Sequence, residues 1–390
     1  EDIPPCSELH SVSGLVLVHA VGKLSRLVLP TQRAEEDLRG RRGSTSNQVV
    51  NLNGDGPTVK LESLKKVRKL GQGAFGAVIE VEIADTPPQS LSTVGSFRRF
   101  IGGETPRRSL TASASMLEVE QPKRFAMKLQ AKTQSNVQWQ ACSELLALKR
   151  AIHPFIVRLE QAFQTPQFYA LLLEFCPGGD VNHLLLKTQA ADGRCLGLPV
   201  SSCARYVGQV LLALAHLHEA LGIVYRDVKP ENVLIATKDV AKLADFGSAL
   251  YVGKSQRTHL AAVGTKGFLA PELVFGVEDD EDEDSDDKVN PFKTDAYSLG
   301  VTLEVMLLGE DSCDIIEDDD GGSWMVPSAG DENDRKELLD SQLESGRLSR
   351  EAHDLLLKLS PHRPDARLCL ADPIVKNHDF FLNNLKCEDL

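Results

Sequence analysis

The chain has 390 residues, of which 42% are hydrophobic and 25% are charged, enough to bury one or two substantial cores. This size and composition fit a two-lobed enzyme and exclude a small binding module. The formal net charge is −13, whereas a protein that follows the phosphates of a nucleic acid is usually basic, so no nucleic-acid partner is expected.

The first part of the chain is rich in strand-like segments. Residues 39–57 contain many Gly, Ser, Asn and Arg residues and are interpreted as a linker. After a run of glycines, alternating β-branched residues predict a strand over 78–83. Residues 84–121 are rich in Pro, Ser and Thr, which indicates a long surface insertion. Further strands are predicted at 125–129, 156–159 and 168–175, and a helix at 137–150.

Helical periodicity dominates from residue 177 onward. Helices are predicted at 201–219, 294–308 and 351–359. Two acidic stretches, 278–287 and 311–334, are interpreted as solvated loops. The patterns together predict an α+β chain with an N-terminal extension and linker (1–63), a strand-rich unit (64–175), a helix-rich unit (176–382) and a short tail (383–390).

The cysteines and the hydrophobic runs indicate the cellular compartment in which the protein is expected. The eight cysteines are scattered, without a CxxC pair, and no His cluster has zinc-ligand spacing. Reduced thiols in an intracellular, cytoplasmic protein are therefore expected. No apolar run reaches the roughly 18 residues of a membrane helix, so no membrane span is predicted. The sequence does not indicate an oligomeric state.

Three glycines, Gly71, Gly73 and Gly76, precede Val78 with the spacing GxGxxGxV. Glycine lets backbone N–H groups approach a phosphate closely because it has no Cβ. The same spacing can bind a dinucleotide, but there the glycines follow a strand and open a helix. Here they lie between two strand-like segments. Taken alone, the motif fits an ordinary hairpin turn equally well.

Lys128 lies in a short apolar strand, directly after Ala126 and Met127. A single lysine in such a strand is more often an edge residue whose ammonium reaches solvent. Glu144 lies on the helix predicted next along the chain. An ion pair between Lys128 and Glu144 would orient the ammonium toward the α- and β-phosphates of ATP.

A second group of polar residues follows the helix predicted to end at residue 219. Asp227 can orient and deprotonate a substrate hydroxyl, and Lys229 can stabilise charge on a moving phosphoryl group. The Asn232 amide oxygen and the Asp245 carboxylate are hard oxygen ligands suited to Mg²⁺. Asp245 stands in Asp-Phe-Gly, and Ala-Pro-Glu, which ends at Glu272, closes the segment that begins there.

These motifs, in this order, form the protein kinase signature. From about residue 64 to residue 381 the chain resembles the eukaryotic protein kinases, and within them the AGC group. The narrower resemblance is carried by His153-Pro154-Phe155-Ile156-Val157, Ala162-Phe163-Gln164-Thr165, Gly178-Gly179-Asp180, Tyr225 before Arg-Asp, and Asn377-His378-Asp379-Phe380-Phe381.

The resemblance implies a bilobal kinase fold: a small antiparallel β-rich N-lobe with one main helix, and a larger helical C-lobe. It implies ATP and Mg²⁺ as cofactors and protein substrates as partners. Asp227 would be the catalytic base, Lys229 would contact the γ-phosphate, and Asn232 and Asp245 would hold Mg²⁺. Asp180 would bind ribose or a basic substrate residue. The implied nucleotide-binding residues are Gly71, Gln72, Gly73, Ala74, Phe75, Gly76 and Val78 over the nucleotide, Ala126, Val181 and Leu234 around adenine, Leu173 as gatekeeper, and Glu174 and Cys176 at the hinge.

The resemblance also implies a continuous apolar stack and a late ion pair. The stack would contain Leu148, Leu159, Tyr225 and Phe246, anchored by Asp295. Glu272 would pair with an arginine late in the chain, Arg367.

Lys229 and Thr265 favour serine and threonine over tyrosine as acceptors. Glu231 resembles the acid that recognises a basic residue upstream of the acceptor, so we expect substrates with basic residues near the target. Two arginine-rich segments, ending at Ser44 and Ser109, resemble such targets and are candidates for autophosphorylation or for internal pseudosubstrates.

Three departures from the AGC pattern limit what the resemblance implies. The expected activation-loop phosphothreonine falls near Ala261, with Thr258 and Thr265 nearby, although Arg226, which usually meets that phosphate, is present. Only nine residues follow Phe381, so the long regulatory tail is absent from this sequence. The acidic insertions are not part of the pattern.

Two other classes of protein make different predictions from an active kinase. A pseudokinase scaffold would lack at least one of Lys128, Asp227, Asn232 or Asp245, and all four are present. A nucleotide-binding oxidoreductase would place a helix after the glycines, where this sequence predicts a strand.

Overall fold

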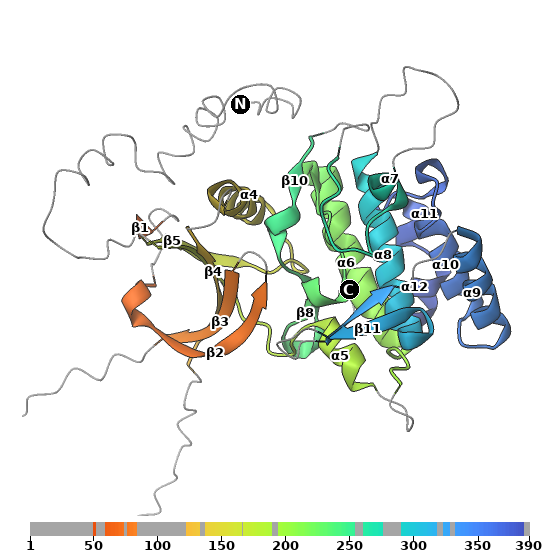
Figure 1. Cartoon of the computed structure of the whole chain (residues 1–390), viewed down its shortest axis with the longest axis horizontal. Helices are drawn as coiled ribbons and strands as arrows, with labels where there is room; N and C mark the ends of the chain where they lie inside the picture. The colour runs from red at the N-terminus through yellow and green to blue at the C-terminus, as the bar shows by residue number, and fades with distance from the viewer. Residues whose placement is uncertain are drawn as a thin grey trace, which may run out of the picture.

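The computed structural model shows an α+β arrangement in which a mostly β part precedes a mostly helical part (Figure 1). This agrees with the predicted fold class. The residues that the structure describes are 50–51, 59–73, 76–83, 122–132, 137–165, 167–188, 194–253, 260–275, 290–317, 323–327 and 332–385.

The β part is one six-stranded antiparallel sheet with the order β1-β5-β6-β4-β3-β2. Its strands are β1 (Val50–Asn51), β2 (Leu64–Gly73), β3 (Gly76–Ile83), β4 (Arg124–Ala131), β5 (Leu159–Gln164) and β6 (Phe168–Glu174). Helix α4 (Val137–Arg150) packs against β4, β5 and β6. Its bounds match the predicted helix.

The two faces of β4 have different neighbours. Phe125 and Met127 belong to a small hydrophobic cluster with residues of β3, β5 and β6. Because side chains alternate between the faces of a strand, Ala126 and Lys128 lie on the other face. There Ala126 joins the main hydrophobic cluster, which extends into the helical part. Strand periodicity therefore directs Lys128 toward the junction of the two parts.

The sheet differs from the sequence expectation at two places. Residues 39–57 were expected to be a linker, but Val50 and Asn51 pair with Gln164 and Phe163 as an edge strand. The predicted strand at 156–159 is shifted, because β5 begins only at Leu159. An exposed edge strand can accept a short partner strand of almost any sequence, which composition alone does not reveal.

The helical part is built around α8 (Pro291–Leu308), in which almost every residue is buried. Packed against it are α6 (Val200–His216) and α10 (Arg350–Leu359), and the π-helical turn Leu217–Leu221 extends α6. The remaining helices are α5 (Val181–Lys187), α7 (Pro271–Val274), α9 (Glu332–Glu344), α11 (Pro373–Lys376) and α12 (Asp379–Asn384). No helix in the described ranges is long and apolar enough to cross a membrane.

Two short antiparallel strand pairs lie between α6 and α7 in the sequence. β7 (Ile223–Val224) pairs with β10 (Leu250–Tyr251). β8 (Val233–Ile235) pairs with β9 (Ala241–Leu243). The segments that contain Asp227 and Asp245 connect these strands, so the pairings fix where both segments begin and end.

The interpretation of 311–334 as a solvated loop was wrong. The chain forms an antiparallel hairpin there, β11 (Cys313–Glu317) with β12 (Ser323–Pro327), followed by α9. Cys313 is buried and Ile315 packs against the main cluster. The acidic residues of this stretch dominated its composition and hid two short apolar runs on either side of Gly321-Gly322, which is a favourable turn sequence.

Several expectations fall on residues outside the described ranges. They are the insertion 84–121, the acidic stretch 278–287, the tail beyond residue 385, and Ser44, Ala74, Phe75, Ser109 and Thr258.

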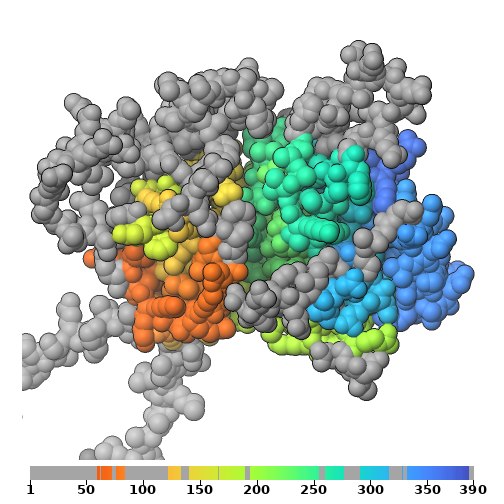
Figure 2. Space-filling model, in the orientation of Figure 1, coloured from red at the N-terminus to blue at the C-terminus, as the bar shows by residue number. Residues whose placement is uncertain are grey.

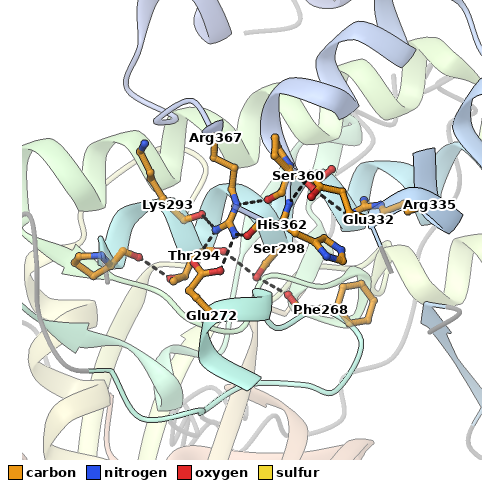
Figure 3. A network of polar contacts seen from close by, with 12 residues as sticks. Phe268, Glu272, Lys293, Thr294, Ser298, Glu332, Arg335, Ser360, His362 and Arg367 are labelled. Carbon is orange, nitrogen blue, oxygen red and sulfur yellow. Dashed lines mark hydrogen bonds and ion pairs between the residues drawn. The ribbon is translucent and has the colours of Figure 1, made fainter. Parts of the chain in front are cut away.

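A buried ion pair joins the segment after Thr265 to the end of the helical part (Figure 3). Arg367 donates to both carboxylate oxygens of Glu272, with N–O distances of 2.7 and 2.6 Å. The same guanidinium donates to the carbonyls of Pro361, Lys293 and His362. Both side chains are almost fully buried, so each charge depends on the other for its solvation.

We expect Arg367→Ala to lower the free energy of unfolding by about 3–5 kcal/mol, because it leaves the Glu272 carboxylate buried without a counter-charge. Urea unfolding followed by circular dichroism measures the change. Arg363→Ala is the matched control, since Arg363 is exposed and surface substitutions usually change stability by less than about 0.5 kcal/mol. Equal unfolding midpoints for the two variants would contradict the expectation.

Candidate active site

A buried carboxylate of α8 fixes the loop that carries Asp227. Asp295 accepts backbone N–H groups of Tyr225, at 2.8 Å, and of Arg226, at 2.7 Å. Its third partner is the His218 ring, at 2.8 Å. Arg226 has a φ of 70°, a left-handed conformation that costs energy for a residue with a Cβ. The hydrogen bonds that the loop N–H groups donate to Asp295 hold the loop in this conformation.

Three side chains converge on the Asp227 carboxylate. Asn232 Nδ2 donates to Asp227 Oδ2 at 2.9 Å and to the Asp227 carbonyl at 2.8 Å. Lys229 Nζ lies 3.2 Å from Oδ2. Thr265 Oγ1 donates to Oδ1 at 2.6 Å, and Lys229 Nζ donates to Thr265 Oγ1 at 2.5 Å. The structure thus brings Asp227 together with Lys229 and Asn232, as the sequence analysis expected, and adds Thr265 to the group.

Asp245 follows β9 in a left-handed conformation, with a φ of 48°. Its Oδ1 accepts the backbone N–H of Gly247 at 3.1 Å. The β8–β9 pairing and a 2.9 Å hydrogen bond from Ala244 N to Asn232 O place the residue before Asp245 beside Asn232. The two predicted metal ligands therefore come from neighbouring backbone positions. In the described ranges, no group of three or more His, Cys, Asp or Glu residues is arranged to hold a metal ion.

Lys128 connects the sheet to both α4 and Asp245. Its Nζ lies 2.7 Å from Glu144 Oε1 and 2.7 Å from Asp245 Oδ1. Gln130 Nε2 donates to the other oxygen of Glu144 at 3.0 Å. Burial works against the ammonium charge, but the two carboxylates outweigh it and raise the pKa of Lys128 above its usual value. The same ammonium keeps the pKa of Asp245 low against the opposing effect of burial.

Gln130 is a residue that the sequence analysis missed. It lies two residues after Lys128, so the strand period places both side chains on one face. That spacing was available in the sequence. His218, by contrast, lies on the helical turn before β7, and nothing in the local pattern marks it as the partner of Asp295.

An apolar stack lies behind these polar groups. Leu148, Tyr225 and Phe246 belong to the main hydrophobic cluster, and Leu159 packs against it. The rings of Tyr225 and Phe246 meet edge-to-face, with centroids 5.3 Å apart. The Tyr225 hydroxyl donates to the Ala244 carbonyl. The stack ties α4 to the loops of Asp227 and Asp245.

The glycine-rich segment forms the turn between β2 and β3, with Gly73 opposite Gly76, Gln72 opposite Ala77 and Gly71 opposite Val78. Gly76 has a φ of 141°, and a Cβ there would lie 1.9 Å from the Leu129 carbonyl oxygen. Only glycine fits at that position. At Gly71 a Cβ would meet nothing within 4 Å, so packing does not require glycine there.

The residues predicted around adenine lie together at the junction of the two parts. Ala126 and Leu173 are opposite each other in the β4–β6 ladder. Val181 and Cys176 are buried in the same main cluster, with Val78 and Leu234 packed against it. Leu234 also forms a backbone bridge with Asp180.

Three acidic residues line the approach to this junction. Asp180 caps α5 by accepting His183 N at 2.7 Å. Glu174, the last residue of β6, forms an ion pair with Lys242 at 2.7 Å. Glu231 is largely buried, and its Oε2 has no hydrogen-bond partner in the described part of the chain. Burial, with Asp180 and Asp227 nearby, raises the pKa of Glu231 to about 7.

The segment that begins at Asp245 is held by Arg226 directly. Arg226 Nε donates to the Ser248 carbonyl at 2.6 Å. Ala261, the position of the expected phosphothreonine, is exposed.

Comparison with known proteins gives the family. A protein kinase domain model matches residues 111–381. The glycine-rich turn lies before the matched stretch, separated from it by most of the insertion. Rhodopsin kinase of Rattus norvegicus is 36% identical over 153 residues, covering 39% of this chain and 24% of that protein. An Aurora kinase of Debaryomyces hansenii is 32% identical over 235 residues, covering 60% and 49%.

Serine/threonine-protein kinase gad8 of Schizosaccharomyces pombe is 27% identical over 350 residues, covering 88% of this chain and 50% of that protein. The chain thus spans half or less of the length of these relatives. Rhodopsin kinase and gad8 are of the AGC type, in agreement with the resemblance found in the sequence. Because the domain match covers well over half of its residues, the chain belongs to the protein kinase domain family.

Proposed function

We propose that this chain is a serine/threonine kinase that transfers the γ-phosphoryl group of ATP-Mg²⁺ to a hydroxyl group of protein substrates. The observation that carries the proposal is the joining of two polar clusters in one place. Lys128 holds Glu144 and Asp245 at 2.7 Å each, and Asp227 is bonded to Asn232, Lys229 and Thr265. Phosphoryl transfer depends mainly on such positioning and on electrostatic stabilisation.

The Lys128 cluster would hold the nucleotide. A raised pKa keeps the Lys128 ammonium charged at neutral pH, and Glu144 with Gln130 fixes its direction. The turn between β2 and β3 would cover the phosphates, and the apolar residues around Ala126, Leu173 and Leu234 would contact adenine.

Asn232 and Asp245 fit Mg²⁺ by the chemistry of their oxygens. The amide nitrogen of Asn232 donates to Asp227. The side-chain nitrogen of Asn232 therefore points toward the loop of Asp227, and its side-chain oxygen does not. Asp245 uses Oδ1 for Lys128 and Gly247. One oxygen of each side chain thus stays available for a hard cation. When bound, the ion would neutralise phosphate charge.

Asp227 would orient the acceptor hydroxyl and take its proton. The loop needs no rearrangement to place the carboxylate, because Asp295 holds the backbone and three donors hold the carboxylate oxygens. Lys229 contacts Oδ2 and Thr265 contacts Oδ1 of this carboxylate, and the presence of both residues beside the base supports the proposed preference for serine and threonine.

Glu231 supports the proposed preference for basic substrates. A buried carboxylate oxygen without a protein partner is costly unless a ligand satisfies it. An arginine or lysine upstream of the acceptor would supply both hydrogen bonds and charge.

We place the protein inside the cell, since the six cysteines that the structure describes are all free thiols.

We expect Asp227→Asn to lower the turnover number by about 10²–10⁴, the usual contribution of a general base, while ATP binding persists because Lys128, Glu144 and Asp245 are untouched. Incorporation of radioactive phosphate into a degenerate peptide library measures turnover, and fluorescent nucleotide titration measures binding. Asp365→Asn, at an exposed site, is the control.

Equal incorporation by Asp227→Asn and the control would contradict the role of Asp227. ATP binding without any incorporation by the unmodified chain would favour the pseudokinase scaffold instead.

The pKa of about 7 for Glu231 gives a pH dependence with a definite sign. Above this pH the carboxylate is charged and attracts an upstream arginine; below it the group is protonated. We expect the ratio of kcat/KM for a peptide with upstream arginine to that for its alanine analogue to fall roughly tenfold between pH 8 and pH 6. Taking the ratio cancels the titration of groups that both peptides use.

Glu231→Gln should give a low ratio at every pH. A ratio that stays pH-dependent in Glu231→Gln would assign the titration to another group, and a ratio of one in the unmodified chain would remove the proposed basic preference.

A further inference from the structure

The hairpin β11–β12 is attached to the helical part of the protein. β12 packs against α5, which begins beside Asp180, and against α8, which carries Asp295. Figure 2 shows this segment, in blue, at the molecular surface next to the yellow-green residues of α5. The structure describes β12 as paired with β11 alone.

The base of the hairpin is firmly attached. Cys313 is buried and donates its Sγ–H to the Gly309 carbonyl at 2.9 Å. Ile315 packs against the main cluster. Asp311 forms ion pairs with Arg347 at 2.9 Å and with Arg194 at 3.5 Å. The charge of Asp311 is therefore compensated within the protein.

The end of the hairpin touches the segment that bonds Asp227. Gly267 has a φ of 87°, and a Cβ there would lie 2.8 Å from Cδ of Pro327. Gly267 is two residues after Thr265, which donates to Asp227. Pro327 is thus packed on the short stretch of backbone that follows Thr265, the residue whose side chain contacts the proposed catalytic base.

Asp314 lies next to the pairing of Cys313 with Pro327. Its side chain is exposed, and within the described ranges it forms no ion pair or hydrogen bond. The acids at the base of the hairpin are used in structural contacts, whereas the Asp314 charge is available to a ligand.

We propose that the hairpin β11–β12 forms one wall of the protein-substrate groove, where Asp314 selects a basic residue on the C-terminal side of the phosphorylated serine or threonine. This inference rests on the proposed function. Two segments lie on either side of Asp227. One contains Glu231, which we assigned above to the substrate residues before the acceptor. The other runs from Thr265 to Gly267. Substrate residues after the acceptor then pass along Gly267 and Pro327, within reach of Asp314.

The test compares peptides that share an upstream arginine and carry either lysine or glutamine at the three positions after the acceptor. The full chain, Asp314→Lys and the matched control Glu337→Lys are assayed with each peptide. Glu337 is exposed on α9, so both variants change the net charge equally. We expect the lysine-to-glutamine ratio of kcat/KM to fall about two- to fivefold in Asp314→Lys, the range of an exposed ion pair, and to stay unchanged in Glu337→Lys.

Pro327→Ala provides a second arm, because it removes the contact with Gly267 without changing any charge, and it should lower the same ratio. Equal ratios in the unmodified chain, Asp314→Lys and Pro327→Ala would overturn the inference while leaving the proposed function intact. No phosphorylation of any peptide by the unmodified chain would overturn both. Unfolding midpoints of the variants that match that of the unmodified chain show that an altered ratio does not come from misfolding.

Discussion

The ion pairs of the Lys128 ammonium with Glu144 and Asp245 are the interaction on which the rest of the structure depends. It comes from the sheet, and its two carboxylate partners come from α4 and from the segment after β9. A buried charge is tolerated only when its counter-charges are in place, so this one group requires the correct position of three elements at once. The apolar stack through Leu148 and Phe246 follows the same path and adds packing that an ion pair alone lacks.

A second buried charge, Asp295, binds backbone N–H groups as well as the His218 ring. It holds Tyr225 and Arg226 by their N–H groups, and so stabilises the left-handed conformation at Arg226. Arg226 in turn holds the Ser248 carbonyl. The backbone after Asp245 is therefore held at Ser248 by a group inside the protein, and this contact requires no phosphate at Ala261.

The sequence predicted those parts of the fold in which local pattern and tertiary contact agree. The bounds of α4 and the facing of Lys128 follow from periodicity, and the pairing of Glu272 with Arg367 follows from family resemblance. The hairpin β11–β12 was missed because acidic residues dominate its composition, while its stability comes from Cys313 and Ile315 packing on a distant core. β1 was missed because its only support is the edge of β5. Gln130 was within reach of strand periodicity; His218 was not, since its role depends on a contact 77 residues away.

The distribution of acidic residues links these observations. Glu144, Glu272 and Asp295 are buried and fully engaged by partners, so they define the architecture. Glu231 and Asp314 are different, since each has a carboxylate oxygen without a protein partner in the described ranges. Glu231 lies four residues after Asp227, and Asp314 lies in the hairpin whose Pro327 is packed against Gly267. A protein with a net charge of −13 attracts cations over its whole surface, but recognition requires charge at fixed positions. The selectivity proposed here thus depends on the few carboxylates that the fold positions without neutralising them.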